Sequence, residues 1–244
     1  DRDWSEQNYT GNFGWKLDEK SELRCFLGNY RGKGTDENSF RKTRKDYVSA
    51  VYKLKWNEKR DAMLLVRLYR NSEHHDYNWK WQGKGIYRQE TLCGEIQQSL
   101  WISDSQLATL GCEKRRESVD IDEVMNRISK HTSITTFYLQ DEIHFGDYFQ
   151  VIAGLRNDHS INYGDELSPR VGFLWRAFRN TEIFASINRA IREPSLSDRF
   201  VKTEYNGMIF EGNPDLDPET LTAYEIGIRT RLTERFSSEL TFFQ

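Results

Sequence analysis

The 244-residue sequence has no apolar run of the roughly 20 residues that a transmembrane helix requires, and its mean hydropathy is −0.80. These values exclude a helical membrane protein. They do not exclude a membrane β-barrel, whose strands are only about 10 residues long and apolar at alternate positions. Proline is scarce, with 4 residues, whereas aromatic residues make up 14%. Because proline interrupts a strand ladder and aromatic rings suit a pleated surface, this balance favours strands.

A disulfide framework and an excess of positive charge are also missing. The three cysteines, Cys25, Cys93 and Cys112, have no CxxC spacing, and their odd number argues against complete pairing. The net charge of −3 gives nucleic-acid binding no electrostatic support. The sequence contains neither a glycine-rich phosphate loop nor a nucleophile elbow. The sequence therefore gives no positive evidence for hydrolase chemistry, a cofactor, a metal ion or a nucleic-acid partner, and we expect none of these.

Alternation of apolar and polar residues is the main positive signal. In residues 46–56, for example, Val48, Ala50 and Tyr52 share one face, and Lys53 and Lys55 share the other. About twelve such segments predict strands, near residues 8–17, 21–30, 46–56, 61–70, 88–102, 106–116, 132–145, 147–157, 167–177, 181–190, 220–232 and 235–244.

The connections between these strands alternate in length. Short turns are expected at 18–20, 57–60, 103–105, 146–147, 178–180 and 233–234. Long polar loops are expected near 31–45, 71–87, 117–131, 158–166 and 191–219, and the second of them carries the adjacent His74 and His75. Within 117–130, Ile121, Val124, Met125 and Ile128 have helical spacing and predict a short helix. Tight turns on one rim and long loops on the other are typical of an up-and-down membrane barrel.

Aromatic residues gather beside the short turns, as in the girdle that a barrel places at the membrane–water interface. They are Trp56, Trp101, Phe145, Tyr148, Trp175, Phe178 and Phe236. A soluble half-buried sheet would show the same alternation, so a soluble β-rich binding protein stays an alternative. The membrane hypothesis requires the face with Tyr224, Ile226 and Ile228 to point outward, whereas the soluble one buries it. A passive or enzymatic outer-membrane barrel also stays open.

Three stretches then carry a family resemblance. The first is 137–142 with 153–159, the second is 167–172 with 184–196, and the third is 212–219 with 223–227. In this order they resemble the TonB-dependent receptors, closely over about residues 132–232 and more weakly upstream. The motif residues, which we expect to be mainly structural, are Gln140, Asp141, Glu142, Pro169, Arg170, Pro194, Ser195, Leu196, Gly212, Asn213, Pro214, Leu216, Pro218, Glu219, Tyr224 and Glu225.

The resemblance implies an all-β fold, an antiparallel transmembrane β-barrel of about 22 strands. About twelve of them would lie in this chain, and both chain ends look cut. Residues 1–244 would be a partial barrel domain without the N-terminal plug, through which the complete receptor contacts TonB–ExbB–ExbD. The receptor would lie as a monomer among the lipids of the bacterial outer membrane and import a scarce ligand.

The family's commonest use favours a ferric siderophore, with cobalamin and haem as alternatives. Haem receptors of this family tend to carry a histidine between the Arg-Pro and Asn-Pro motifs. Residues 190–220 contain no histidine, which argues against haem. Candidate ligand contacts are Tyr77, Trp79 and Trp81, by stacking and cation–π contact, and the lumen residues Arg189 and Arg192. The two arginines are expected to pair with lumen carboxylates. His74 and His75 are not expected to share a metal ion, because neighbouring side chains on an extended chain point to opposite sides.

Overall fold

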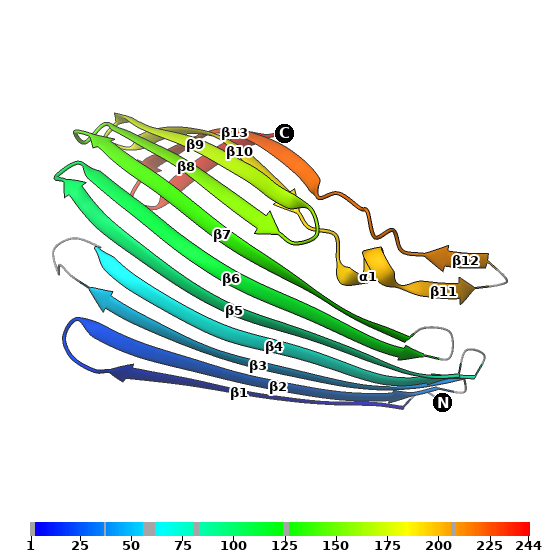
Figure 1. The fold of residues 1–244 in the computed structure, drawn as a ribbon. Coiled ribbons are helices and arrows are strands. Elements are labelled where there is room, and N and C mark those ends of the chain that lie inside the picture. The colour runs from blue at the N-terminus through cyan, green and yellow to red at the C-terminus, as the bar shows by residue number, and fades with distance from the viewer. Residues whose placement is uncertain (1–2, 37, 56–61, 81–82, 124–126, 206–207) are drawn as a thin grey trace.

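The computed structural model describes residues 3–36, 38–55, 62–80, 83–123, 127–205 and 208–244. It consists of one 12-stranded antiparallel sheet in which each strand pairs with the next along the chain, apart from a small β11–β12 hairpin inserted between β10 and β13 (Figure 1). The strands of the sheet are β1 (Asp3–Lys16), β2 (Ser21–Thr35), β3 (Ser39–Lys55), β4 (Met63–Trp79), β5 (Gly83–Ser103), β6 (Gln106–Glu123), β7 (Arg127–Phe145), β8 (Phe149–Ser160), β9 (Gly164–Phe178), β10 (Thr181–Arg192), β13 (Glu219–Thr233) and β14 (Phe236–Phe243).

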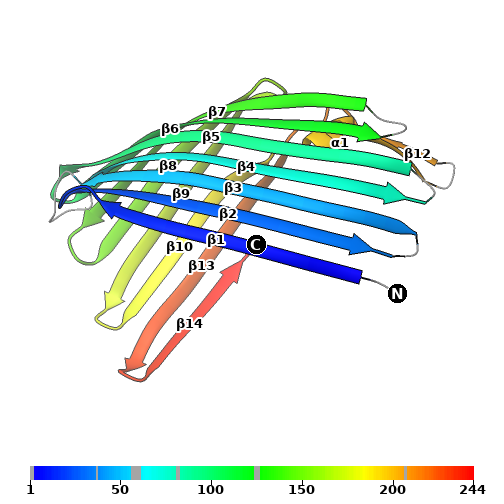
Figure 2. The same ribbon diagram turned by 90° about the horizontal axis from the view of Figure 1, so that it is seen from below.

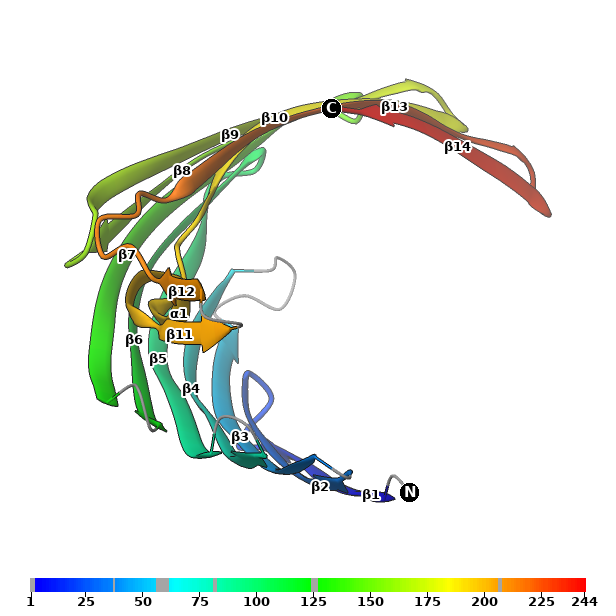
Figure 3. The same cartoon turned by 90° about the vertical axis from the view of Figure 1, so that its right-hand side faces the viewer.

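The sheet is one layer thick and curves into an open arc, and the segment between β10 and β13 lies inside the arc (Figure 3). This segment holds α1 (Leu196–Phe200), β11 (Lys202–Tyr205) and β12 (Met208–Glu211). The direction of the strands turns between β1–β7 and β8–β14, as expected of tilted strands that wrap around a barrel axis (Figure 2). No helix among the described residues is long and apolar enough to cross a membrane.

The two faces of the wall are assigned from the contact between α1 and β6. Leu196 of α1 packs on Val119 and Ile121, so these odd-numbered positions of β6 define the inner, concave face. Cross-strand partners share a face, and the register runs without a shift from β1 to β4 and from β6 to β8. Ala108 is an even-numbered residue of β6 and therefore lies on the outer face. Its successive cross-strand partners are Asp141, Ala153, Val171, Ile187 and Tyr224, so Tyr224 also lies on the outer face.

The outer face carries an exposed apolar band. Tyr224, Ile226 and Ile228 are 51%, 56% and 41% exposed, which agrees with the outward orientation that a membrane barrel requires. Ten residues separate Ile102 from Leu92 on β5, roughly 33 Å of strand at about 3.3 Å per residue and roughly 25 Å at a tilt of about 40°. This height matches the apolar band of outer-membrane barrels. Within the described sheet this face is exposed and not buried in a core, as the soluble alternative would require.

All twelve predicted strands are present, but three of the predicted long loops are wrong. Residues near 31–45, 71–87 and 117–131 mostly extend the strands, and pairing continues to Thr35 opposite Phe40 and Asp122 opposite Arg127. The helix predicted at 117–130 is wrong for the same reason, since Ile121 and Ile128 are cross-strand partners. Beyond the apolar band both faces are polar, so the apolar alternation ends there although the backbone pairing continues. The 158–166 connection is also shorter than predicted, because β8 ends at Ser160 and β9 begins at Gly164.

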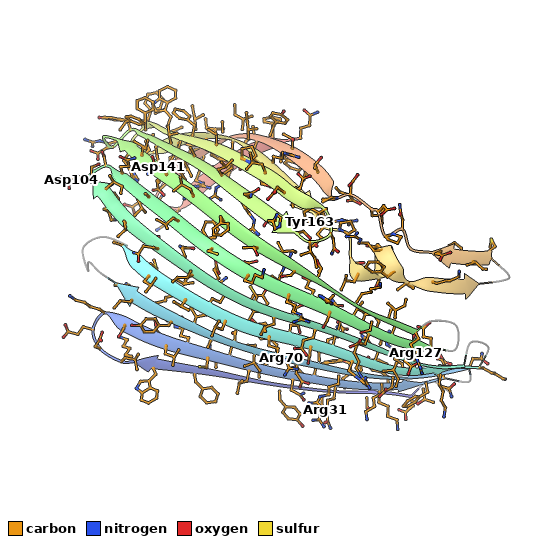
Figure 4. The ribbon with its side chains drawn as sticks, in the orientation of Figure 1. Arg31, Arg70, Asp104, Arg127, Asp141 and Tyr163 are labelled. Carbon is orange, nitrogen blue, oxygen red and sulfur yellow. The ribbon has the colours of Figure 1, made fainter. Side chains whose placement is uncertain are left out.

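The predicted short turns lie together at one end of the wall, where Figure 4 labels Asp104 and Asp141. The turn at 57–60 and the rim residue Trp56 lie outside the described residues. Phe145, Tyr148, Trp175, Phe178 and Phe236 are exposed at this end, as predicted for a girdle. The placement of Trp101 in that girdle is wrong. It lies on the inner face, where its ring stacks on His144 with 6.0 Å between centroids.

Candidate functional site on the inner face of the wall

A partly buried ion pair on β8, joined to β7 by a hydrogen bond, lies on the inner face. Asp158 is only 5% exposed, and Arg156 donates to it from Nε at 2.9 Å and from Nη2 at 2.8 Å. The hydroxyl of Thr136 also donates to Asp158, and Arg156 Nη2 reaches that hydroxyl at 3.1 Å. These donors satisfy the lone pairs of the buried carboxylate.

A second group joins β4, β5 and β7. The hydroxyl of Tyr138 donates to Glu95 at 2.8 Å, and Arg67 forms an ion pair with Glu95 at 3.1 Å. Gly111 lies directly opposite Tyr138, and a Cβ at this glycine would come within 2.2 Å of the tyrosine ring. The absence of a side chain at Gly111 therefore allows the ring to lie across β6 toward Glu95.

These groups border a cavity of about 550 Å³ on the inner face. Its charged lining residues are Arg115, Arg156, Arg170, Arg189, Glu95, Asp158 and Glu193. Tyr163, in the turn between β8 and β9, also lines it, and burial raises the pKa of this tyrosine to about 12 (Figure 4). A cavity with four arginines and several hydroxyl and amide groups can bind an anionic or hydrogen-bonding molecule.

The segment after β10 closes over this face. Glu193 accepts hydrogen bonds from Arg115 Nη2 at 3.3 Å and from the Thr132 hydroxyl at 3.4 Å. Burial raises the pKa of Glu193 above its ordinary value, although Arg115 opposes this shift. Leu196 is 7% exposed against β6, and Lys130 lies 5.0 Å from the centroid of the Phe200 ring. The segment is therefore fixed to the wall by both polar and apolar contacts.

The motif residues before and after α1 hold this segment together. Ser195 caps the helix in a reciprocal pair of hydrogen bonds with Asp198. Gly212 donates its backbone N–H to Val201 at 2.8 Å, and a Cβ here would lie 2.6 Å from the backbone of Arg199. The positive-φ glycines of the described chain are Gly83, Gly146 and Gly164, so Gly212 is not required for a left-handed backbone conformation. Its requirement is close approach to α1.

The remaining motif residues have mostly structural contacts. Asn213 accepts a bond from the Asp215 backbone N–H at 3.0 Å, and the carbonyl oxygen of Pro214 accepts one from Arg199. Leu216 is 37% exposed, and Pro218 precedes β13.

The motif residues of the wall also have mostly structural contacts. Glu142 accepts bonds from His144 at 2.9 Å and Gln150 at 2.7 Å. Asp141 accepts a bond from Gln106 on the outer face, Glu225 accepts one from Ser186 at 3.5 Å, and Gln140 and Arg170 line the cavity. Pro194 precedes the Ser195 cap, and Pro169 lies on β9 opposite Leu155.

The predicted ligand contacts do not lie in one place. Arg189 forms an ion pair with Glu166 at 3.1 Å and lines the cavity, and Arg192 forms one with Glu219 at 2.9 Å. Both arginines therefore pair with carboxylates, as predicted. Tyr77 lies toward the far end of β4 and donates to Glu123. Trp79 is the last residue of β4, and Trp81 lies outside the described residues.

His74 and His75 point to opposite faces, as predicted. His74 Nε2 contacts Asp76 at 2.9 Å on the outer face, and His75 Nε2 contacts Glu73 at 2.7 Å on the inner face. Within the described ranges, no cluster of three or more metal-ligating side chains is present. Cys25, Cys93 and Cys112 are all free thiols.

Of the residues that form most of the site, Tyr138, Arg156 and Asp158 lie in the first stretch of the family resemblance and Glu193 lies in the second, but they were not proposed as site residues. Arg115 lies outside all three stretches. Strand alternation was the signal that could have assigned Arg115, Tyr138, Arg156 and Asp158 to the inner face, because it places them opposite the apolar residues of β6, β7 and β8. Glu193 had no such signal, since it follows the end of β10.

An open, single-layer wall with an apolar outer face and a charged inner face is the architecture of a large outer-membrane barrel. Residues 1–244 match the family described as "TonB dependent receptor-like, beta-barrel" over their whole length. The chain belongs to this family. TonB-dependent receptors are transport receptors rather than enzymes, and they lie in the bacterial outer membrane.

Individual members of the family are similar over different lengths. The chain is 29% identical over 144 residues to an "Iron-regulated outer membrane virulence protein" of Vibrio cholerae, which covers 56% of this chain and 22% of that protein. The solved siderophore receptor PirA of Pseudomonas aeruginosa has a TM-score of 0.86, 18% identity and coverage of 98% and 45%. The haemophore receptor HasR of Serratia marcescens has a TM-score of 0.85, 12% identity and the same coverage. The chain thus spans about a fifth of the Vibrio relative and less than half of each solved receptor chain.

Proposed function

We propose that this chain forms part of the wall of an outer-membrane receptor that imports a ferric siderophore with energy supplied through TonB. The observation that carries the proposal is the inner face, where four arginines line a cavity beneath an inward-folded segment. Ferric siderophores are commonly anionic, and guanidinium groups on a low-dielectric wall attract anions and hydrogen-bond with them.

The complete receptor would contain further strands and a plug. The described sheet has unpaired edges at β1 and β14, and unpaired backbone groups are not tolerated in lipid, so additional strands would complete the barrel. We propose that residues 1–244 are a partial barrel domain, that a plug encoded elsewhere contacts TonB–ExbB–ExbD, and that the complete receptor is a monomer.

The relatives support iron-related transport as the first choice. The Vibrio cholerae relative is named as iron-regulated, and the neighbour from Pseudomonas aeruginosa is a siderophore receptor. Tyr77, Trp79 and Trp81 stay candidate contacts for an aromatic siderophore. Haem is the second candidate because HasR shares the fold, but residues 190–220 here lack a histidine. Cobalamin is the third.

The test uses the complete receptor gene in a host that lacks its own siderophore and haem receptors. Cells are grown under iron limitation with a ferric tris-catecholate, a ferric tris-hydroxamate or haem, and uptake of labelled iron is measured with and without TonB. We expect TonB-dependent uptake of at least one siderophore class. Uptake of haem alone would transfer the proposal to the haem alternative, and TonB-independent uptake would contradict it.

Within the complete receptor, Arg170→Gln should weaken siderophore binding, because Arg170 lines the cavity. Arg176→Gln is the matched control on the same strand, since Arg176 pairs with Glu182 at 3.4 Å near the short turns, away from the cavity. Equal affinities for both variants would remove the inner-face cavity from the ligand path.

A further inference from the structure

The outer face of the β2–β3 hairpin carries an unusual cluster of like charges. Arg31 lies directly opposite Arg44, and Lys33 lies directly opposite Lys42. All four side chains are exposed. Like charges in direct cross-strand pairs destabilise a sheet, so two such pairs in succession are expected to need counter-charges from outside the hairpin.

The hairpin itself supplies little compensation on this face. Arg44 forms an ion pair with Asp46 at 2.7 Å, and Lys33 lies 6.0 Å from the centroid of the Phe40 ring. Asp76 of β4 lies directly opposite Lys42 on the same face, and Asp46 interacts electrostatically with Arg31, but neither cation forms an ion pair with a described carboxylate. We call Arg31, Lys33, Lys42 and Arg44 the outer cationic patch.

The patch lies just beyond the apolar band on the same two strands. Leu27 and Val48 form the last apolar pair of the hairpin, and Asn29 opposite Asp46 follows. Four residues separate Leu27 from Arg31, roughly 13 Å of strand and roughly 10 Å of height at a tilt of about 40°. Long basic side chains near a membrane boundary bend toward the polar headgroups. The long side chains of the patch therefore extend back toward the membrane and reach the headgroup layer.

The short turns identify the leaflet. They lie at the opposite end of the wall from the patch (Figure 4, where Arg31 marks the patch and Asp104 a short turn). Outer-membrane barrels place their short turns in the periplasm and their long hairpins outside the cell. The patch thus faces the outer leaflet.

We propose that the outer cationic patch binds the phosphorylated headgroup of an outer-leaflet lipid. The occupant follows from two properties of one continuous surface. The apolar band contacts acyl chains, and the patch directly beyond it offers two guanidinium and two ammonium groups, which bind phosphate strongly. A molecule with phosphate above acyl chains satisfies both regions at once. It also relieves the repulsion within the two like-charged pairs.

Strand β3 provides a matched control. Arg41 and Lys45 lie on the inner face of the same strand, where Arg41 contacts His75 and Lys45 forms an ion pair with Glu73 at 2.7 Å. Arg41→Gln/Lys45→Gln removes two charges from β3 but none from the outer face. Lys42→Gln/Arg44→Gln removes two charges from the proposed site.

The experiment reconstitutes the complete receptor in phosphatidylcholine nanodiscs with lipopolysaccharide, and lipid retained on the protein is measured by native mass spectrometry. Each cation near an anionic membrane surface contributes roughly fivefold to binding, so Lys42→Gln/Arg44→Gln should weaken retention by roughly 25-fold. The inner-face variant should retain lipopolysaccharide like the wild type. Dephosphorylated lipopolysaccharide should bind the wild type as weakly as the intact lipid binds the outer-face variant.

A second readout keeps the test independent of folding. The dephosphorylated lipid is compared on the unmodified receptor, so its result stands even if a variant is unstable. Equal binding of intact and dephosphorylated lipid would overturn the proposal. So would equal losses in both double variants, because the effect would then follow total charge and not the outer face. Retention of an acidic protein by the patch with no retention of phosphorylated lipid would likewise overturn it.

Discussion

Replacing Leu196 with alanine should release the inward-folded segment while leaving the wall intact. Leu196 is 7% exposed and packs on Val119 and Ile121, which are 2% and 3% exposed. Leucine-to-alanine changes in cores cost about 2–5 kcal/mol. Because this contact joins a surface segment to one face of a sheet, we take the lower part of that range, about 2–3 kcal/mol. Since about 1.4 kcal/mol is a factor of ten, the segment should open roughly 30- to 150-fold more often.

Hydrogen exchange of the complete receptor measures this opening. The backbone N–H groups of Arg199, Val201 and Gly212 are hydrogen-bonded within the segment, so their exchange should accelerate by this factor. Exchange in β6 and β7 should stay unchanged. Leu216→Ala is the control in the same segment, because Leu216 is already 37% exposed. Unchanged exchange at α1, or equal acceleration in the wall, would refute the view that Leu196 is a local anchor.

Three further predictions concern the wall and the segment. Leu139→Arg on the outer face should destabilise the barrel by about 2–4 kcal/mol, whereas Gln140→Arg on the inner face should be nearly neutral; urea unfolding in lipid vesicles compares them, and equal losses would contradict the assignment of faces. Gly212→Ala should cost about 1–3 kcal/mol because its Cβ would meet the Arg199 backbone at 2.6 Å, whereas Gly172→Ala has its nearest neighbour at 4.0 Å, and protease sensitivity of the segment should separate the two. Because burial raises the pKa of Glu193, the docked segment holds a proton more tightly than the open one, so docking should weaken as pH rises from the ordinary value of 4.5 through the raised one. Glu193→Gln should remove this pH dependence. The ratio of wild-type to variant hydrogen-exchange rates in the segment, measured at each pH, would show it. A ratio that is constant with pH would contradict the proposed role of Glu193.

The strands could be predicted where one face of the wall meets lipid. There the apolar side chains alternate with polar ones, as in Val48, Ala50 and Tyr52 on β3, and all twelve strands have this signal. Beyond the membrane both faces are wet, so residues such as Arg44 and His74 carry no hydrophobic period although their strands stay paired. The polar extensions were therefore mistaken for loops.

The inner-face site was harder to predict because it depends on register. Arg156 and Asp158 are close in sequence, but their partner Thr136 comes from β7, and Tyr138 reaches Glu95 across β6. A shift of one residue in any of these strands would break the arrangement. The family motifs located the supports of the inward-folded segment, such as Ser195 and Gly212, but not the charged residues against which it packs.

In a single-layer wall, adding or removing one residue in a strand moves the side chains beyond it to the opposite face. In β3, Arg41 and Lys45 belong to the inside of the barrel, and Lys42 and Arg44 belong to the outside. Deleting one residue near the middle of this strand would send each of these groups to the other compartment, while deleting two would only shorten the hairpin. Insertions and deletions in the strands of this protein should therefore be tolerated in pairs, whereas the segment between β10 and β13 should obey no such rule.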